Sequence, residues 1–347
     1  MNKQNPKIIP ETWVIFDKRA GTLQQAIAVA ELIGLPFKII TPEYSKLNAL
    51  PNFILPASSL RIKRKNRLEL KNITNYPKII IGAGRKSANI SCFIKNQAKL
   101  ENIKIANIHI MNPQMNFNFF DLIILPDHDK ANYCRNNIIR INGAINNINH
   151  STLEQAVIKF QQTPLYQKID LQAQNKIALL IGGSSKNSIF EPKSMQNLIE
   201  HSCKIAKEMS AQLLILNSRR TSNQLNEIIK SSLDGNYYFF DCNDKDFNQN
   251  NPYLAILGIA NFIIATGDSI SMISEALNSG KTIYIFDEEK ISTKKHRLFH
   301  RYLFTNNYAK KLDDNILDLE SINNRYPNQA SIILDKINLT LLLNKNL

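Results

Sequence analysis

Residues 262–286, FIIATGDSISMISEALNSGKTIYIF, restrict the fold more than any other stretch of the chain. Residues 262–265 and 282–286 are short apolar runs, typical of strands that are buried on both faces of a parallel sheet. Between them apolar residues recur at helical spacing, and Gly280 ends the helix because glycine accepts left-handed backbone angles. The stretch therefore predicts a βαβ unit of an open sheet, which binds ligands beyond the carboxyl ends of its strands.

The start of this predicted helix carries groups that bind anions. Asp268 and Ser269 can cap the helix, Ser271 adds a hydroxyl, and the free N–H groups and helix dipole favour negative charge. Glu275 follows one turn later, where its carboxylate could accept hydrogen bonds from the hydroxyl pair of a sugar. The plainer alternative is a βαβ unit whose helix is simply well capped.

The same alternation of strands and helices recurs along both halves of the chain. Strands are expected at residues 13–16, 37–40, 78–81, 104–110, 119–125, 176–181, 213–216 and 237–240. The fold class predicted is α/β, with two Rossmann-like, doubly wound domains that face each other across a cleft. We expect an N-terminal domain at 1–162, a hinge at 163–175, a C-terminal domain at 176–300, and helices at 301–347 that pack back on the first domain.

Polar residues follow two further predicted strands of the second half. One set is Gly182, Gly183, Ser184 and Lys186, and the other is Ser218, Arg219 and Thr221. Glycine N–H groups, hydroxyls and cations can bind phosphate, whereas the absence of GxxxxGK[ST] argues against an NTPase. Together with the start of the helix before Glu275, these sets suit a nucleoside diphosphate attached to a sugar.

Strand ends in the first half suit an acceptor substrate and a base. Asp17 follows the first strand, and Gly21 lets a ligand approach the backbone closely. A turn with Gly84 and Arg85 could bind an anion, although it could also be only a tight strand-to-helix connection. His109 ends another strand and is an acceptor-side candidate, the alternative being a structural hydrogen-bonding residue.

A second candidate for the base lies at residues 127–129, where two carboxylates flank an imidazole. Asp127 and His128 could remove a proton from an acceptor hydroxyl, as could Asp17, and the sequence does not decide between them. Aspartates at such positions also cap turns.

Charge is uneven along the chain, which has a net charge of +14. Residues 1–150 hold 21 Lys and Arg against 9 Asp and Glu, whereas residues 151–347 hold 22 against 20. The basic first half, with its run LRIKRKNR at 60–67, is expected to contact an anionic membrane surface, the alternative for the run being a solvated loop. Nucleic acid is a weaker alternative, because no aromatic residues are interleaved in the run.

Cysteine spacing and the absence of an apolar leader indicate a cytoplasmic protein. The four cysteines have no metal-ligand or disulfide-framework spacing, and the N-terminal residues lack a signal-peptide core. We expect no metal and no cofactor apart from a nucleotide-sugar donor substrate. If the basic half contacts lipid, the protein would be peripheral on the cytoplasmic face of the inner membrane.

Several motifs, taken together and in order, resemble a known family over roughly residues 12–305. They include Asp17…Gly21…Gln25, Gly82-Ala83-Gly84-Arg85, FDLI at 120–123 with PDHD at 126–129, GGSSK at 182–186, SRRT at 218–221, NPY at 251–253 and DSISMISEA at 268–276. The arrangement resembles GT-B glycosyltransferases. More specifically, it resembles the family of the plant elongated-mitochondria fission factor, whose proteobacterial relatives are described as glycosyltransferases of lipooligosaccharide outer-core type.

The resemblance implies a sugar transferase whose donor is held on the C-terminal domain by a Ser/Thr-rich turn and a glutamate on the next helix. It also places Gln25 on the acceptor side. The expected reaction moves a sugar from a nucleotide sugar to a lipid-linked or lipooligosaccharide-core acceptor, without a metal. The alternative is a non-catalytic adaptor that recruits partners at a membrane, which is favoured by Lys18 where the family pattern has glycine after Asp17.

Overall fold

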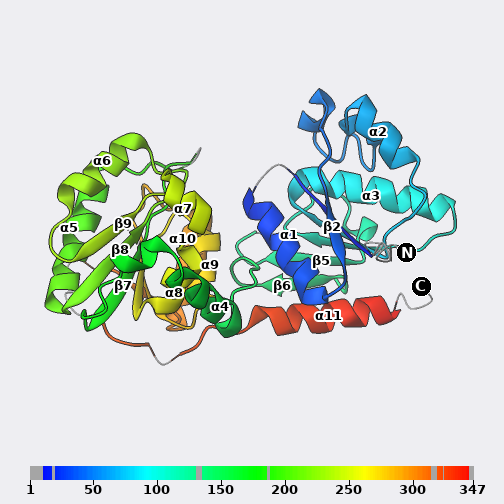
Figure 1. Ribbon diagram of the computed structural model, residues 1–347. Helices are drawn as coiled ribbons and strands as arrows, with labels where there is room; N and C mark the ends of the chain where they lie inside the picture. The colour runs from blue at the N-terminus through cyan, green and yellow to red at the C-terminus, as the bar shows by residue number, and fades with distance from the viewer. Residues whose placement is uncertain are drawn as a thin grey trace, which may run out of the picture. The chain divides into compact units, whose positions relative to one another are not determined.

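The chain forms two compact units in the computed structural model, which describes residues 11–17, 20–129, 135–185, 188–313, 319–322 and 324–343 (Figure 1). One unit comprises Met1–Asn147 with Asn328–Leu347, and the other comprises Ile148–Pro327. Each contains one six-stranded parallel sheet with helices against its faces. The predicted α/β fold class is therefore confirmed.

The sheet of the first unit has the order β2-β1-β3-β4-β5-β6. Its strands are β1 (Thr12–Ile15), β2 (Phe37–Ile40), β3 (Ile79–Ala83), β4 (Ala106–Ile110), β5 (Leu122–Pro126) and β6 (Ile138–Ile141). Its helices are α1 (Ala20–Ile33), α2 (Arg64–Lys71), α3 (Gly84–Leu100) and α11 (Gln329–Leu343). Buried Ile, Val and Ala side chains cover both faces of the central strands, which explains why these strands read as continuous apolar runs.

The sheet of the second unit has the order β12-β11-β10-β7-β8-β9. Its strands are β7 (Asn175–Leu180), β8 (Ala211–Leu216), β9 (Tyr237–Phe240), β10 (Phe262–Thr266), β11 (Thr282–Phe286) and β12 (Lys310–Lys311). Its helices are α4 (His150–Gln161), α5 (Pro192–Glu208), α6 (Asn223–Ser232), α7 (Lys245–Asn250), α8 (Tyr253–Ile259), α9 (Ile270–Asn278) and α10 (Lys294–Thr305). The βαβ unit predicted from residues 262–286 is thus β10-α9-β11, at the bounds expected.

The division between the units differs from the predicted boundary. Residues 148–162 and the predicted hinge lie inside the second unit, because α4 packs on α8 and buries Leu153 and Phe160 in that core. Residues 301–327 also belong there, through buried Leu303 and Ala309. Among the C-terminal helices described, α11 returns to the first unit, where Ile333 and Ile337 are buried in the core that includes α1.

Candidate functional site

The site is built at the carboxyl edge of the second sheet, where β7, β8 and β10 end side by side. Leu180 of β7 lies opposite both Leu216 of β8 and Ala265 of β10, so the turns that follow these strands meet. The neighbouring order β10-β7-β8 therefore brings together the three polar turns that the sequence singled out.

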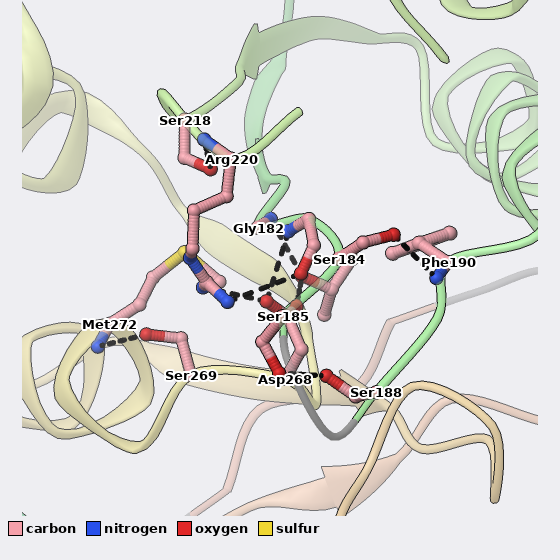
Figure 2. Close-up of polar contacts among 12 residues, drawn as sticks. Gly182, Ser184, Ser185, Ser188, Phe190, Ser218, Arg220, Asp268, Ser269 and Met272 are labelled. Carbon is pink, nitrogen blue, oxygen red and sulfur yellow. Dashed lines mark hydrogen bonds and ion pairs between the residues drawn. The ribbon is translucent and has the colours of Figure 1, made fainter. Parts of the chain in front are cut away.

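A buried carboxylate holds these turns together. Asp268 Oδ2 accepts the Gly183 N–H at 3.0 Å and lies 2.7 Å from Arg220 Nη2, while its Oδ1 accepts the Thr266 hydroxyl at 2.6 Å. Arg220 also donates from Nη1 to the Gly183 carbonyl at 3.1 Å. Figure 2 shows the guanidinium of Arg220 lying between the turn at Ser218 and the turn at Asp268. One ion pair thus fixes the geometry of all three strand ends.

Two glycines are required where the backbone approaches this network. A Cβ atom at residue 182 would lie 2.0 Å from Asp268 Oδ2, and one at residue 183 would lie 2.2 Å from the Arg220 carbonyl oxygen. Thr221 closes the same turn by donating its hydroxyl to the Gly182 carbonyl at 2.5 Å. Any larger residue at 182 or 183 must push the turns apart.

The first turn of α9 presents donors beside this network. Ser269 caps the helix, its hydroxyl oxygen accepting the Met272 N–H at 3.4 Å. The N–H groups of Ile270 and Ser271 belong to the first helical turn, and no described residue accepts from them. With the helix dipole and the half-exposed Arg220, they make this edge suited to an anion.

Glu275 lies one turn further along α9 and is paired with a tyrosine. Its Oε2 accepts the Tyr253 hydroxyl at 2.7 Å. Burial raises the pKa of Glu275, and the Tyr253 hydrogen bond opposes that rise. The tyrosine fixes one carboxylate oxygen of Glu275.

His296, in the first turn of α10, is a residue that sequence reasoning did not select. Its Nδ1 accepts the Thr293 N–H at 3.3 Å in the cap of α10, so in the neutral ring the proton sits on Nε2. Burial lowers the pKa of His296 to about 4, with a further lowering by His300. The charge of Asp268 opposes this lowering of the His296 pKa, and the charge of Arg220 adds to it.

The predicted set at Ser218, Arg219 and Thr221 needs one revision. Arg220, rather than the predicted Arg219, enters the network, because the Ser218 hydroxyl accepts the Arg220 N–H at 3.2 Å and the turn directs that side chain inward. Arg219 is exposed. Ser184 accepts the Phe190 N–H at 3.0 Å, so part of its hydrogen-bonding capacity serves the turn. Lys186 lies outside the described residues.

In the first unit, Asp17 is a buried carboxylate at the end of β1. It accepts the Thr22 hydroxyl, and it lies two residues beyond the last register pair of β1 and β3, Ile15 with Gly82. Gly84 has a φ of +78°, and a Cβ there would lie 2.8 Å from Asp17 Oδ2, so both its angles and its space require glycine. Gly21 lies in the first turn of α1, where its carbonyl accepts the Gln25 side-chain amide at 3.4 Å.

Asp17 and the Asp127–His128 pair lie at two separate positions along the edge of the first sheet. The sheet order sets β3 and β4 between β1 and β5, a separation of about 14 Å at the usual strand spacing. Asp127 is 44% exposed and forms an ion pair with Arg140 at 3.2 Å. Asp127 and Asp129 have an Asp-X-Asp spacing, but no group of three or more potential metal-ligand side chains occurs among the described residues.

The Arg85 side chain forms hydrogen bonds with the backbone of the first unit. Its guanidinium donates to the Leu50 carbonyl at 2.8 Å and to the Asn48 carbonyl at 3.1 Å. The basic run at 60–67 is also not one solvated face, because Arg61 is fully buried and binds three backbone carbonyls. The exposed charge of this run therefore comes from its remaining residues.

His109 gives the first unit a pH-dependent stability. The ring is fully buried beside Phe120, neither nitrogen has a hydrogen-bond partner among the described residues, and burial lowers its pKa to about 3. The unfolded chain binds this proton below pH ~6.5 and the folded chain does not, so the stabilisation is complete above that pH and is lost as pH falls towards 3.

We expect unfolding free energy to fall by about 1.4 kcal/mol more per pH unit in the wild type than in His109→Leu between pH ~6 and ~4. Urea unfolding at a series of pH values measures this difference. Parallel curves for the two proteins would show that His109 is protonated equally in both states.

Comparison with known proteins relates the chain to one family. The sequence profile of the mitochondrial fission ELM1 family matches residues 20–335. An uncharacterised protein of Rickettsia prowazekii is 34% identical over 367 residues, covering 96% of this chain and 99% of that protein. The mitochondrial fission protein ELM1 of Arabidopsis thaliana is 22% identical over 230 residues, which cover 60% of this chain and 51% of the plant protein.

Solved structures share the fold. A UDP-N-acetylglucosamine 2-epimerase superposes with a TM-score of 0.52 at 14% identity, covering 87% of this chain and 82% of its own. The kitacinnamycin glycotransferase superposes with a TM-score of 0.50 at 12% identity, covering 95% of this chain and 90% of its own. At this identity the likeness establishes the α/β architecture of GT-B glycosyltransferases and epimerases, and no more.

Proposed function

The chain belongs to the mitochondrial fission ELM1 family, and we propose that it is a glycosyltransferase that binds a nucleotide sugar at the carboxyl edge of its second sheet. The observation that carries the proposal is the Asp268–Arg220 pair, which holds the turns at Gly183 and Ser218 beside the first turn of α9, whose free N–H groups can bind an anion. The fold likeness to a glycotransferase and to an epimerase named for a nucleotide sugar agrees with it.

Each group in this edge has a role in the proposed reaction. Arg220 and the N–H groups at the start of α9 would bind the diphosphate and stabilise the charge that develops on it as the sugar departs. Glu275, oriented by Tyr253, would accept hydrogen bonds from the ribose hydroxyls. His296 Nε2 would donate a further hydrogen bond to the donor. These groups would supply the charge stabilisation in a reaction that we propose is metal-independent.

For the acceptor we retain the narrower expectation of a lipid-linked or lipooligosaccharide-core sugar. Asp17 is the preferred candidate for the base, because its carboxylate is buried and ordered by Thr22, whereas Asp127 is exposed and paired with Arg140. A cytoplasmic enzyme at the membrane surface would reach such an acceptor. None of the described helices has both the length and the apolar character needed to cross a bilayer.

Calorimetric titration with a panel of UDP, GDP, ADP and CMP sugars tests the donor site. At least one nucleotide sugar is expected to bind, and Arg220→Lys should weaken it about ten-fold, because a lysine cannot contact both Asp268 and the Gly183 carbonyl. Arg219→Lys is the matched control and should stay within about two-fold. Absence of binding across the panel, or equal effects of both substitutions, would contradict the proposal.

Glu275→Gln distinguishes the contribution of the ribose to binding from the contribution of the phosphates. Loss of the negative charge should weaken the nucleotide sugar about ten-fold through the ribose while leaving inorganic pyrophosphate unaffected. The same titration with pyrophosphate provides the comparison. Equal weakening of both ligands would place Glu275 outside the ribose position.

The adaptor alternative is supported by the name of the plant relative, which is a mitochondrial fission protein. It predicts that cells depend on the protein's surface and tolerate Arg220→Lys. If that variant fully replaces the wild type in cells despite its weakened binding of the nucleotide sugar, the adaptor role is the better account.

A further inference from the structure

Large apolar side chains are unusually exposed in one short part of the first unit, which we call the 47–68 surface. Isolated exposed apolar residues are ordinary in proteins, whereas clusters mark interaction sites. This surface contains Leu47, Leu50, Phe53, Ile54, Leu60 and Leu68. Phe53 is 74% exposed and Ile54 is 56% exposed. In Figure 1 this segment is the blue stretch that leads into α2.

A single buried arginine binds the backbone of the loop that carries several of these residues. Arg61 is fully buried, and its guanidinium donates to the carbonyls of Leu50, Pro51 and Leu55 at 2.8, 2.7 and 2.9 Å. The Ser45 N–H donates to the Arg61 carbonyl, and the Ser45 hydroxyl donates to the Leu60 carbonyl. The loop at 50–55 and the turn at Leu60 therefore surround one guanidinium.

Further side chains from α3 and the loop itself hold the loop in place. The buried Asn52 side chain donates to the carbonyls of Arg85 and Pro113, both at 2.8 Å. Asn89 donates to the Leu55 carbonyl at 2.6 Å. The usual arrangement is thus inverted, with an arginine and an asparagine inside and a phenylalanine and an isoleucine outside. A loop ordered before binding loses little entropy when its apolar tip is covered.

The charge around this tip identifies what covers it. Residues 41–71 contain seven Lys and Arg against two Glu, and Lys46, Lys63, Arg64 and Lys65 are exposed. Apolar side chains flanked by cations match the interface of an anionic bilayer, where acyl chains lie just beneath negative headgroups. Nucleic acid would present phosphates but no apolar layer for Phe53 and Ile54.

We propose that the 47–68 surface docks the protein on an anionic phospholipid bilayer, with Phe53 and Ile54 inserted among the headgroups and Lys46, Arg64 and Lys65 in contact with lipid phosphates. The inference deepens the proposed function, since it names the surface by which a transferase would reach a lipid-linked acceptor. Only the role given to this docking rests on the proposed function. Vesicle binding itself is measured without any nucleotide sugar.

Sedimentation with vesicles tests the proposal on the full chain. The wild type should bind vesicles of equal parts phosphatidylglycerol and phosphatidylcholine, bind pure phosphatidylcholine vesicles much more weakly, and be released by high salt. The double variant Phe53→Ser/Ile54→Ser should bind the anionic vesicles at least about ten-fold more weakly. The control Leu100→Ser/Ile103→Ser removes two other exposed apolar residues of the same unit and should bind as the wild type does.

A fluorescent variant distinguishes insertion from surface adsorption. Phe53→Trp should show a blue-shifted emission on adding anionic vesicles, over the constant signal of the buried Trp13, and should be quenched by brominated lipid. Wild-type protein that does not bind anionic vesicles, a Phe53→Ser/Ile54→Ser variant that binds normally, or an unshifted emission would overturn the proposal. So would a wild-type dimer that this variant converts to monomers, since the surface would then bind a second copy. Intact sugar binding alongside any of these results would leave the proposed transferase standing.

Discussion

Asp268→Ala is expected to lower the free energy of unfolding of the second unit by about 3–4 kcal/mol, as befits removal of one partner from a buried ion pair. The carboxylate is 1% exposed and accepts from Arg220, Gly183 and Thr266, so its loss leaves three donors without an acceptor. Because Arg220 is itself 38% exposed, water recovers part of the loss, which keeps the estimate below the upper end for a fully buried pair.

Asp127→Ala is the matched control for this experiment. Asp127 also pairs with an arginine, but it is 44% exposed and its ion pair is longer, at 3.2 Å. Its removal should cost under about 1 kcal/mol. Urea unfolding followed by circular dichroism measures both variants, and equal losses would show that Asp268 does not organise the three turns.

Arg61→Ala is expected to destabilise the first unit by about 3 kcal/mol or more. The substitution removes three hydrogen bonds from a charged donor, each worth about 1.5 kcal/mol or more. Each carbonyl keeps one other donor, which is Arg85 for Leu50, the Ile54 N–H for Pro51 and Asn89 for Leu55. The Arg61 guanidinium makes these contacts without a carboxylate partner among the described residues, so the backbone carbonyls themselves satisfy the buried charge.

Trp13 offers a local probe for this prediction, because it packs in the same core as Ile62, the neighbour of Arg61. Its fluorescence during urea unfolding should report the loss in Arg61→Ala. Arg64→Ala, which removes an exposed arginine from the same run, should change the unfolding free energy by less than about 0.5 kcal/mol. If Arg61→Ala is equally mild, the loop at 50–55 is held by other contacts.

Periodicity identified most of the sheet, because strands of a parallel α/β sheet are buried on both faces and leave apolar runs. β10, α9 and β11 lie where residues 262–286 predicted them. The unit boundary at Asn147 was missed because α4 is assigned to the second unit by its packing on α8, a contact far apart in sequence. No local pattern specifies such a partner.

The candidate site was predictable at the level of turns and less so at the level of side chains. Glycines and hydroxyls after β7, β8 and β10 marked three turns that the structure brings together at one edge of the sheet. Which of two adjacent arginines turns inward depends on the hydrogen bond from the Arg220 N–H to Ser218, which composition does not reveal. Arg61 likewise read as a surface charge, because the carbonyls that bury it come from residues six to eleven positions away.

A crystal structure of the protein with the nucleotide sugar selected by titration would show where the donor binds. We expect the diphosphate within hydrogen-bond distance of Arg220 and of the Ile270 and Ser271 N–H groups, with the ribose hydroxyls at Glu275. A nucleotide sugar bound elsewhere on the chain, or an empty edge at Asp268 under saturating ligand, would contradict the proposal.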